Sequence, residues 1–358
     1  MLFPITQINS NLRQIEEIPN TFFQKIQANA VFGYDLFPDW FQEFYGNRTD
    51  GLYNKANILF DIIKNSGNEP RIVEGYINSI NIESHCLNLS SYLFYCETIS
   101  QELFEAANDF FSHLFDSFDK KWVTDKTQTN VLKYIKEFKE QNKVFVCPIC
   151  GNEKIKSSQH EARAALDHWL CKAKYPFSAV NWNNLFPLGE GCNRPPVKGQ
   201  NEVIWIDNNR LARHSFFYPF NWLGEIEISL ECIEEPSIDS LIKGSWKFNF
   251  LGINDLHQNL IDKWDIFFGI NNRWIDETLN EFIDTWTFTF ANYLTQEINF
   301  EDFEVRYDEK LISFRNARNS FNVNPQNRVE WFFLNYLINE ASASFYNGSK
   351  QSVREHLE

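Results

Sequence analysis

The hydrophobic and polar positions of the N-terminal part of the chain repeat mainly with the period of an α-helix. In residues 130–142, apolar side chains lie at helical spacing, and Lys and Glu residues fill positions between them. The same period recurs in residues 53–63, after an Asp-Gly turn signal, and in the longer segment 87–118, which is expected to form one long helix or a broken one. The pattern therefore predicts a helical N-terminal region.

After residue 142 the pattern changes to shorter segments of strand type. Alternation of apolar and polar residues predicts strands at 143–146, 203–206, 225–232 and 245–251. Helical periodicity returns at Asn254 and predicts helices in 274–294 and 327–345. The chain is therefore expected to have an α+β fold, with a helical N-terminal region, a central segment and a mixed strand and helix C-terminal region at 1–142, 143–215 and 216–358.

The aromatic content of the chain is high, with 35 Phe, 13 Tyr and 11 Trp among 358 residues. Large rigid rings favour a core packed through aromatic contacts, whereas a surplus at the surface would favour a protein partner. No run of about 18 apolar residues occurs, and the N-terminus lacks the basic start and apolar run of a signal peptide. We therefore expect a cytoplasmic protein with no membrane association.

The net charge of −15 argues at first against a nucleic-acid ligand, because phosphate binding normally needs a basic surface. The distribution of the charge changes this interpretation. Residues 141–214 carry ten Lys or Arg and six Asp or Glu, a net charge of +4, so the rest of the chain carries −19. A basic segment in an acidic chain is expected if one face contacts a phosphate backbone.

Four of the seven cysteines lie between residues 147 and 199. Cys147 and Cys150 form a CxxC motif followed by glycine, which is half of a zinc knuckle, because the glycine lets the backbone fold back and direct both sulfurs inward. The motif fits a reduced compartment and metal binding better than a disulfide framework. Cys192 is the candidate third ligand, and Gly189 stands where a fourth would be expected. A reduced cluster without metal is the alternative.

The Asp167-His168 pair is the second candidate site. In a metal-dependent hydrolase, a carboxylate holds a divalent cation and an imidazole activates the water beside it. Adjacent residues of a strand point to opposite faces, so both can serve one site only at a strand end or bend. Asn184 and Asn193 offer amide oxygens downstream. Four basic side chains are candidates for phosphate contacts: Lys172, Lys174, Arg194 and Lys198.

Four ordered motifs within residues 147–199 resemble the HNH endonuclease family. They read CPxCG, LDHxLxKxxYP, NxxNLxP and CNxxxxKG, and the similar subgroup has its histidine in a DHxLPKxxYP context flanked by cysteine pairs. The similar stretch covers about a seventh of the chain. The resemblance implies a central ββα-metal (HNH) finger, in which a hairpin carries the catalytic histidine and a helix carries the last metal ligand.

The resemblance also implies a role for each site residue. His168 would be the general base that deprotonates the attacking water, a task that suits an imidazole because its pKa lies near neutrality. Asp167 would bind one divalent ion, Mg²⁺ or Mn²⁺, and Asn193 would be the second ligand of that ion. Asn184 would hold the hairpin and orient His168. The products would carry 5′-phosphate and 3′-hydroxyl ends.

The chain departs from the family pattern at two places. Gly189 replaces a family cysteine, which leaves a structural Zn²⁺ site one ligand short. Two other residues are candidates for that ligand: His160 and Cys171. Pro195-Pro196 come just after Asn193, where the metal-bearing helix should begin, and proline is tolerated in the first turn of a helix but not in its interior.

The implied function is a metal-dependent HNH endonuclease that hydrolyses phosphodiester bonds of nucleic acid, with DNA preferred. The flanking regions show no recognisable sequence-reading module, so we expect a partner protein to supply recognition or activation. Proteins of this kind often resemble the nuclease effectors of bacterial anti-phage defence or mobile-element systems. The alternative is a catalytically inactive, zinc-finger-like binding or scaffold subunit of a larger complex, which Gly189 and Pro195-Pro196 favour.

Overall fold

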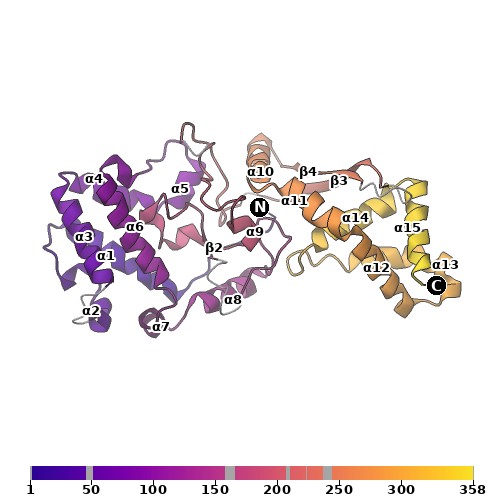
Figure 1. The fold of residues 1–358 in the computed structure, drawn as a ribbon, viewed down its shortest axis with the longest axis horizontal. Helices are drawn as coiled ribbons and strands as arrows, with labels where there is room; N and C mark the ends of the chain where they lie inside the picture. Colours follow the sequence, from indigo (N-terminus) through magenta and orange to yellow (C-terminus); the bar gives the residue numbers. More distant parts are fainter. Residues whose placement is uncertain are drawn as a thin grey trace. The chain divides into compact units, whose positions relative to one another are not determined.

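The structure is a computed structural model that describes residues 2–45, 51–157, 166–206, 210–222, 224–236 and 244–357. The chain divides into two compact units, and Figure 1 labels most of their helices and strands. The helical unit consists of Pro4–Asn142 and Ile155–Trp222, and the C-terminal unit consists of Met1–Phe3, Lys143–Lys154 and Leu223–Glu358. The central segment of the sequence is therefore shared between the two units.

The helical unit carries the Asp-His pair on a short hairpin. Its described elements are η1 (Asn11–Glu16), α1 (Glu17–Gln27), η2 (Tyr34–Leu36), α2 (Asp39–Tyr45), α3 (Leu52–Asn65), α4 (Glu69–Ser79), α5 (Ile82–Leu87), η3 (Cys96–Thr98), α6 (Gln101–Asp116), α7 (Lys121–Thr127), α8 (Val131–Asn142), β1 (Leu166–His168), η5 (Pro176–Ser178), η6 (Trp182–Asn184), β2 (Leu185–Pro187) and α9 (Glu190–Asn193). The helices predicted at 53–63 and 130–142 are confirmed as α3 and α8.

The helix predicted at 87–118, as one piece or broken, is confirmed only in its second part, as α6. Helix α5 ends at Leu87, and a turn follows in which Oδ1 of Asn88 accepts a hydrogen bond from the N–H of Ser90 at 2.9 Å. Helix α6 begins only after Ser100, whose Oγ accepts a hydrogen bond from the N–H of Leu103 at 3.1 Å. Polar residues that bond to the nearby backbone thus end one helix and start the next, although the apolar residues continue between them.

Phe177, in the connection between β1 and β2, lies in the aromatic core of the helical unit. Its ring centroid lies 5.3 Å from that of Phe23, 5.8 Å from Tyr76 and 5.6 Å from both Phe94 and Phe111. Aromatic pairs at these separations contribute about 0.5–1.5 kcal/mol beyond the burial of their area. The hairpin connection is therefore anchored in the same core as α1, α4 and α6.

The C-terminal unit combines a two-stranded antiparallel sheet with helices. Its described elements are β3 (Glu227–Glu234), β4 (Ser245–Leu251), α10 (Asp255–Phe268), α11 (Ile270–Trp274), η7 (Ile275–Leu279), α12 (Asn280–Glu297), η8 (Phe300–Asp302), α13 (Phe303–Asn316), α14 (Asn327–Asn339) and α15 (Ala343–Glu355). The predicted start of a helix at Asn254 is confirmed, because the Asn254 side chain accepts the N–H of His257 at 2.9 Å and caps α10.

The α+β class is confirmed in general form, since helices occur together with two small antiparallel sheets, β1-β2 and β3-β4. The strands predicted at 225–232 and 245–251 are confirmed with small shifts as β3 and β4. Those predicted at 143–146 and 203–206 are wrong, because each contributes only an isolated bridge: Val146 with Lys154, and Trp205 with Arg213. Neither four-residue run pairs with a longer strand among the described residues.

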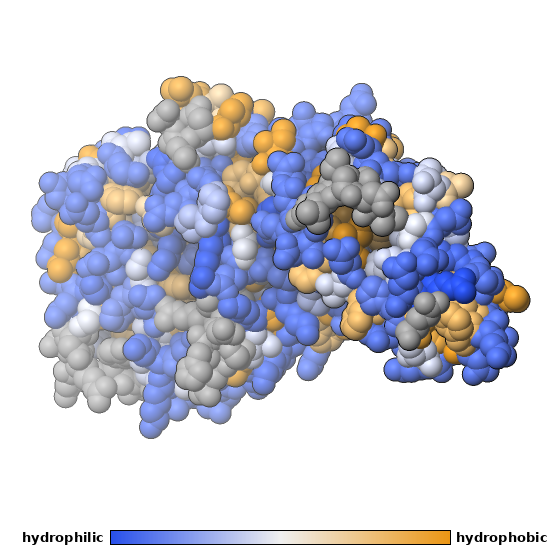
Figure 2. Space-filling model, turned by 45° about the vertical axis from the view of Figure 1, so that its right-hand side comes forward, coloured by the Kyte–Doolittle hydropathy of each residue, from blue (hydrophilic) through white to orange (hydrophobic). Residues whose placement is uncertain are grey.

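Few of the described aromatic side chains are exposed at the surface. Hydrophilic side chains cover most of the face seen in Figure 2, and hydrophobic ones occur in small groups. Among the aromatic residues that the structure describes, Tyr92, Phe288 and Phe300 are exposed at 46%, 51% and 44%. Most of the aromatic surplus therefore packs inside the two units. None of the described helices combines the length and the apolar character required to cross a lipid bilayer.

Candidate active site and metal-binding cluster

The Asp167-His168 pair lies at the end of a hairpin strand. Strand β1 pairs antiparallel with β2, so that Asp167 lies opposite Phe186 and His168 lies opposite Leu185. His168 is the last residue of β1, and the short helix α9 follows β2. The strand end is the position in which neighbouring side chains can serve one site. The order of hairpin and helix is also the order that the resemblance implies.

The His168 imidazole is held in one orientation and one tautomer. Its Nε2 atom lies 2.8 Å from the carbonyl oxygen of Ala179. Because a carbonyl only accepts hydrogen bonds, Nε2 carries the proton of the neutral ring and Nδ1 is the basic nitrogen. The Phe115 ring centroid lies 4.4 Å from that of the imidazole, and His168 is 8% exposed. The imidazole is therefore held by a hydrogen bond at Nε2 and by packing against Phe115.

Asn184 fixes the chain that follows His168. Its Oδ1 accepts the N–H of Leu170 at 2.7 Å, while its Nδ2 donates to the carbonyls of Leu170 at 2.9 Å and Ser178 at 3.1 Å. The carbonyl of Asn184 also accepts the N–H of Trp169 at 2.8 Å. Asn184 is fully buried. Its geometry suits the holding role that the sequence predicts, because it ties both ends of the connection around His168.

Asp167 forms an ion pair with a lysine inside the helical unit. Nζ of Lys198 lies 2.9 Å from Oδ2 of Asp167 and donates a hydrogen bond of 2.6 Å to the carbonyl of His168. The Lys198 side chain is 1% exposed. The sequence predicts a phosphate contact for Lys198, but a side chain enclosed in this way does not present its ammonium group at the surface. The structure instead joins Lys198 to both members of the Asp-His pair.

The other predicted phosphate contacts each have an acidic neighbour. Nζ of Lys172 lies 3.9 Å from a carboxylate oxygen of Asp116. Lys174 lies 3.0 Å from the buried carboxylate of Glu202. The described basic side chain that is most exposed among these candidates is Arg194, which is 66% exposed and forms an ion pair with Glu190. A phosphate would therefore compete with these carboxylates for the cations.

Asn193 is the last residue of α9. Its N–H donates to the carbonyl of Gly189 at 3.0 Å. The prediction that the helix begins after Asn193 is wrong, because α9 begins at Glu190 and ends at Asn193. The physical reason is the proline that follows Arg194, since a residue before proline is excluded from the helical region, and Arg194 has φ −89° and ψ 159°. Pro195 therefore ends the helix that carries Asn193.

The segment after α9 folds back toward the hairpin. The N–H of Lys198 donates to the carbonyl of Cys192 at 3.3 Å, and that of Gly199 donates to Asn193 at 2.9 Å. Gly199 has φ +46°, and a Cβ atom there would lie 2.7 Å from Cγ of Pro195. Glycine is therefore required at this turn. The turn brings Lys198 back to the Asp-His pair.

The CxxC motif forms a knuckle in the C-terminal unit. The N–H of Cys147 donates to the carbonyl of Glu153 at 2.7 Å, and the N–H of Gly151, with φ +71°, donates to that of Cys147 at 2.8 Å. The indole N–H groups of Trp264 and Trp274 donate to the carbonyls of Ile149 and Cys150 at 3.2 and 2.9 Å. The backbone polar groups of the knuckle are therefore bonded within the protein, which leaves its geometry defined before any metal binds.

Two cysteines and one glutamate of the C-terminal unit form a group that can hold a metal ion. One ligand atom from each of Cys147, Cys150 and Glu153 lies within 4.8 Å of the others. Cys192, the third ligand that the sequence predicts, belongs to the helical unit, and Glu153 is a member that the sequence analysis does not name. The sequence signal for Glu153 is its position three residues after Cys150. The family pattern places the missing ligand at position 189 instead, near Cys192. Cys171 is not in the group, and His160 lies outside the described residues.

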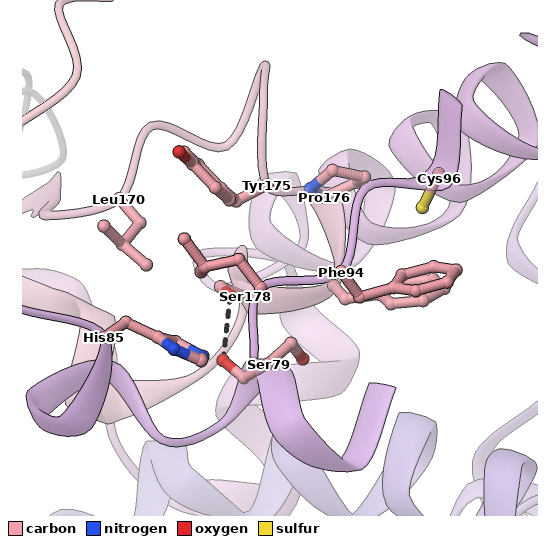
Figure 3. Close-up of a pocket in the computed structure, with 10 residues that line it drawn as sticks. Ser79, His85, Phe94, Cys96, Leu170, Tyr175, Pro176 and Ser178 are labelled. Carbon is pink, nitrogen blue, oxygen red and sulfur yellow. Dashed lines mark hydrogen bonds between the residues drawn. The ribbon is translucent and has the colours of Figure 1, made fainter. Parts of the chain in front are cut away.

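A narrow cavity lies beside the connection between β1 and β2. Figure 3 shows its lining, in which Oγ of Ser178 donates to the carbonyl of Ser79 at 2.9 Å and His85 lies on the same side. The cavity offers about 10 Å³ to a water-sized sphere, which is about what a single water molecule needs. Nε2 of His85 donates to the carbonyl of Asn78 at 2.9 Å. The cavity is therefore a packing gap, and the titratable residues of its lining are His85, Cys96 and Tyr175.

His85 makes the stability of the protein depend on pH. Burial, reinforced by the nearby Arg213 charge, lowers the pKa of His85 to about 4, against an opposing contribution from the hydrogen bond to Asn78. Below about pH 6.5 the His85 imidazole binds a proton in the unfolded chain but stays neutral in the folded chain. The free energy of unfolding therefore falls as the pH falls toward 4. We expect wild type to lose roughly 2–3 kcal/mol more than His85→Gln between about pH 7 and 4.5. Urea unfolding at both pH values measures this difference, and equal losses would contradict it.

The comparisons with known proteins assign no family to the chain. No family model matches it, and no curated protein and no solved structure matches it. The resemblance to the HNH endonucleases therefore depends on the motif residues between 147 and 199, and the activity that follows from it is a proposal.

Proposed function

We propose that this protein is a metal-dependent endonuclease of the HNH type that hydrolyses phosphodiester bonds of nucleic acid, with DNA preferred. One observation carries the proposal. His168 lies beside Asp167 at the end of β1 and donates Nε2–H to the carbonyl of Ala179. This bond makes Nδ1 the nitrogen that can accept the proton of an attacking water. Asn184 supports it by fixing the connection on both sides of the imidazole.

The residues assigned to the divalent ion have suitable chemistry. The Asp167 carboxylate and the Asn193 amide oxygen are hard ligands of the kind that Mg²⁺ and Mn²⁺ prefer, and Mg²⁺ commonly uses one or two carboxylates together with water and phosphate. When bound, the ion would neutralise the scissile phosphate and stabilise the departing 3′ oxygen. The chain's own part is to orient the His168 base and to hold Asp167, which Lys198 does directly.

Recognition of the nucleic acid is expected to involve a partner protein. The Lys172, Lys174 and Arg194 cations have acidic neighbours within the chain. A phosphate group must therefore displace these carboxylates before it can pair with the same cations. A low intrinsic affinity for nucleic acid follows from this competition. A partner that brings the substrate to the site would overcome it. A role as the nuclease effector of a bacterial anti-phage or mobile-element system suits such dependence.

A plasmid-nicking assay tests the proposed activity. The purified chain is incubated with supercoiled DNA and with RNA in the presence of Mg²⁺ or Mn²⁺, alone and with the protein encoded beside it. Cleavage by wild type that is lost in His168→Ala supports the proposal. Absence of cleavage by wild type under all of these conditions would refute it.

The second candidate function is a binding or scaffold subunit without catalysis. The observation that favours it is the burial of Lys198 against Asp167, because a carboxylate already neutralised by an ammonium group is a poorer ligand for a second cation. A scaffold would bind its partner equally well as wild type and as His168→Ala, and neither chain would cut nucleic acid. The nicking assay therefore separates the two functions.

We also propose that the metal ion of the cysteine and glutamate group is Zn²⁺, since thiolates with one carboxylate form a donor set that zinc accepts. The purified chain is expected to contain about one zinc per molecule, and Cys150→Ser is expected to contain less than about a tenth of that amount. Elemental analysis of both proteins measures the content. Cys232→Ser, which changes a cysteine outside the group, is the control and should retain its zinc.

A further inference from the structure

The ammonium group of Lys198 is a built part of the candidate active site. It contacts Oδ2 of Asp167 at 2.9 Å and the carbonyl of His168 at 2.6 Å. Lysine is almost never fully buried unless it is paired, and the Lys198 side chain is 1% exposed. The glycine turn at Gly199 and the hydrogen bond from the N–H of Lys198 to Cys192 hold the backbone in place. The lysine charge is therefore fixed beside the carboxylate.

This pair changes the charge that the site offers to a divalent ion. The positive charge of Lys198 cancels the negative charge of Asp167. Asn193 carries no charge, and His168 adds no negative charge in either of its protonation states. Affinity for a hard cation rises with the number of charged ligands, because each carboxylate offsets part of the loss of hydration. The residues assigned to the ion by the resemblance, together with Lys198, therefore offer it oxygen ligands but no net negative charge.

We propose that Lys198 is a positioning residue that makes divalent-ion binding depend on the phosphate of the substrate. This inference rests on the nuclease function proposed above. A phosphodiester group brings one negative charge into the site, which supplies the charge that the Asp167-Lys198 pair lacks. The ion and the nucleic acid then bind cooperatively. Each raises the affinity of the other by the same factor, since the coupling free energy is shared.

The coupling is measured directly on the wild-type chain. Mn²⁺ binding is followed by the electron paramagnetic resonance signal of the free ion, without nucleic acid and with a phosphorothioate DNA duplex that resists cleavage. We expect the duplex to tighten Mn²⁺ binding at the Asp167 site by about 10-fold or more, within the usual range of about 5–150-fold for coupled sites. The signal that remains in Asp167→Asn is subtracted, which removes binding at the cysteine group.

Removal of the lysine charge should weaken this dependence. In Lys198→Met no ammonium group balances the negative charge of Asp167, so Mn²⁺ binding without DNA is expected to tighten by about 10-fold and the effect of DNA to shrink. Lys310→Met is the matched control, because Lys310 is 11% exposed and pairs with Glu297 at 2.7 Å. It should leave both affinities unchanged. Circular dichroism establishes whether each variant is folded. If Lys198→Met is unfolded, the comparison of wild type with and without DNA still tests the inference.

The outcomes separate the two proposals. If wild type and Lys198→Met bind no more Mn²⁺ than Asp167→Asn, with or without DNA, the divalent site of the proposed nuclease is refuted. If wild type binds Mn²⁺ at Asp167 equally tightly with and without DNA, the inference about Lys198 is overturned while the nuclease proposal stands. Weaker Mn²⁺ binding by a folded Lys198→Met would also overturn it, because the lysine would then support the ion.

Discussion

Replacement of His168 by alanine is expected to lower the rate of phosphodiester cleavage by about 10²–10⁴-fold, the range for loss of a general base. The imidazole is held by the hydrogen bond to Ala179 and by the Phe115 ring, so its basic nitrogen is already oriented before substrate binds. The substitution removes this base but leaves Asp167 and Asn184 in the site. Nicking rates of supercoiled plasmid at saturating Mn²⁺ measure the effect.

His214 provides a matched control for this substitution. Its Nε2 also lies close to a backbone carbonyl, at 2.9 Å from that of Val203, and its ring lies 5.8 Å from Phe216. It has no Asp beside it in the sequence. His214→Ala should therefore cleave at the wild-type rate, with a similar small loss of stability. A His168→Ala chain that cuts as fast as His214→Ala would show that the imidazole is structural.

Replacement of Asn184 by alanine is expected to destabilise the helical unit by about 3–5 kcal/mol. The substitution leaves the buried N–H and carbonyl of Leu170 and the carbonyl of Ser178 without their Asn184 bonds, and each such loss costs about 1–3 kcal/mol. Cleavage by the chain that stays folded should fall by about 10²-fold, because the connection that orients His168 loosens. Chemical denaturation and the nicking assay measure the two effects.

The neighbouring residue Asn183 is the control for the stability measurement. Its side chain is only partly buried and accepts one long hydrogen bond, from Arg13 at 3.3 Å. Asn183→Ala is expected to change the free energy of unfolding by less than about 1 kcal/mol. If Asn183→Ala and Asn184→Ala were equally destabilised, the loss would not come from the bonds around the hairpin.

Local sequence signals predicted the elements whose ends are defined by nearby residues. Helix α10 starts where Asn254 can cap it, and β3 and β4 follow an alternation that one buried face imposes. The helix predicted through 87–118 is confirmed only in its second part, because the apolar pattern continues across a break that Ser100 and its neighbours impose. Helix and strand patterns report which side chains are buried, and they do not report where the backbone turns.

The roles of individual site residues depended on contacts that no sequence pattern shows. The motifs placed Asp167, His168 and Asn184 together on the hairpin, because short spacing determines their neighbours. Lys198 could be recognised as a cation from the sequence, but its burial depends on the turn that Gly199 allows and on the end of α9 that Pro195 imposes. Glu153 had the appearance of an ordinary acidic residue. Its place beside Cys150 follows from the backbone of the knuckle.

The position of Phe177 in the aromatic core has a consequence for the order of events during synthesis. The rings of Phe23, Tyr76 and Phe111 emerge from the ribosome long before Phe177, which packs against all three. Ser178 and Asn181 then supply donors to the carbonyls of Ser79 and Ile80 at the end of α4. The nascent N-terminal helices therefore remain an incomplete core until residues 176–184 have been translated, and a chain terminated after residue 142 would keep these aromatic side chains exposed to chaperones and proteases.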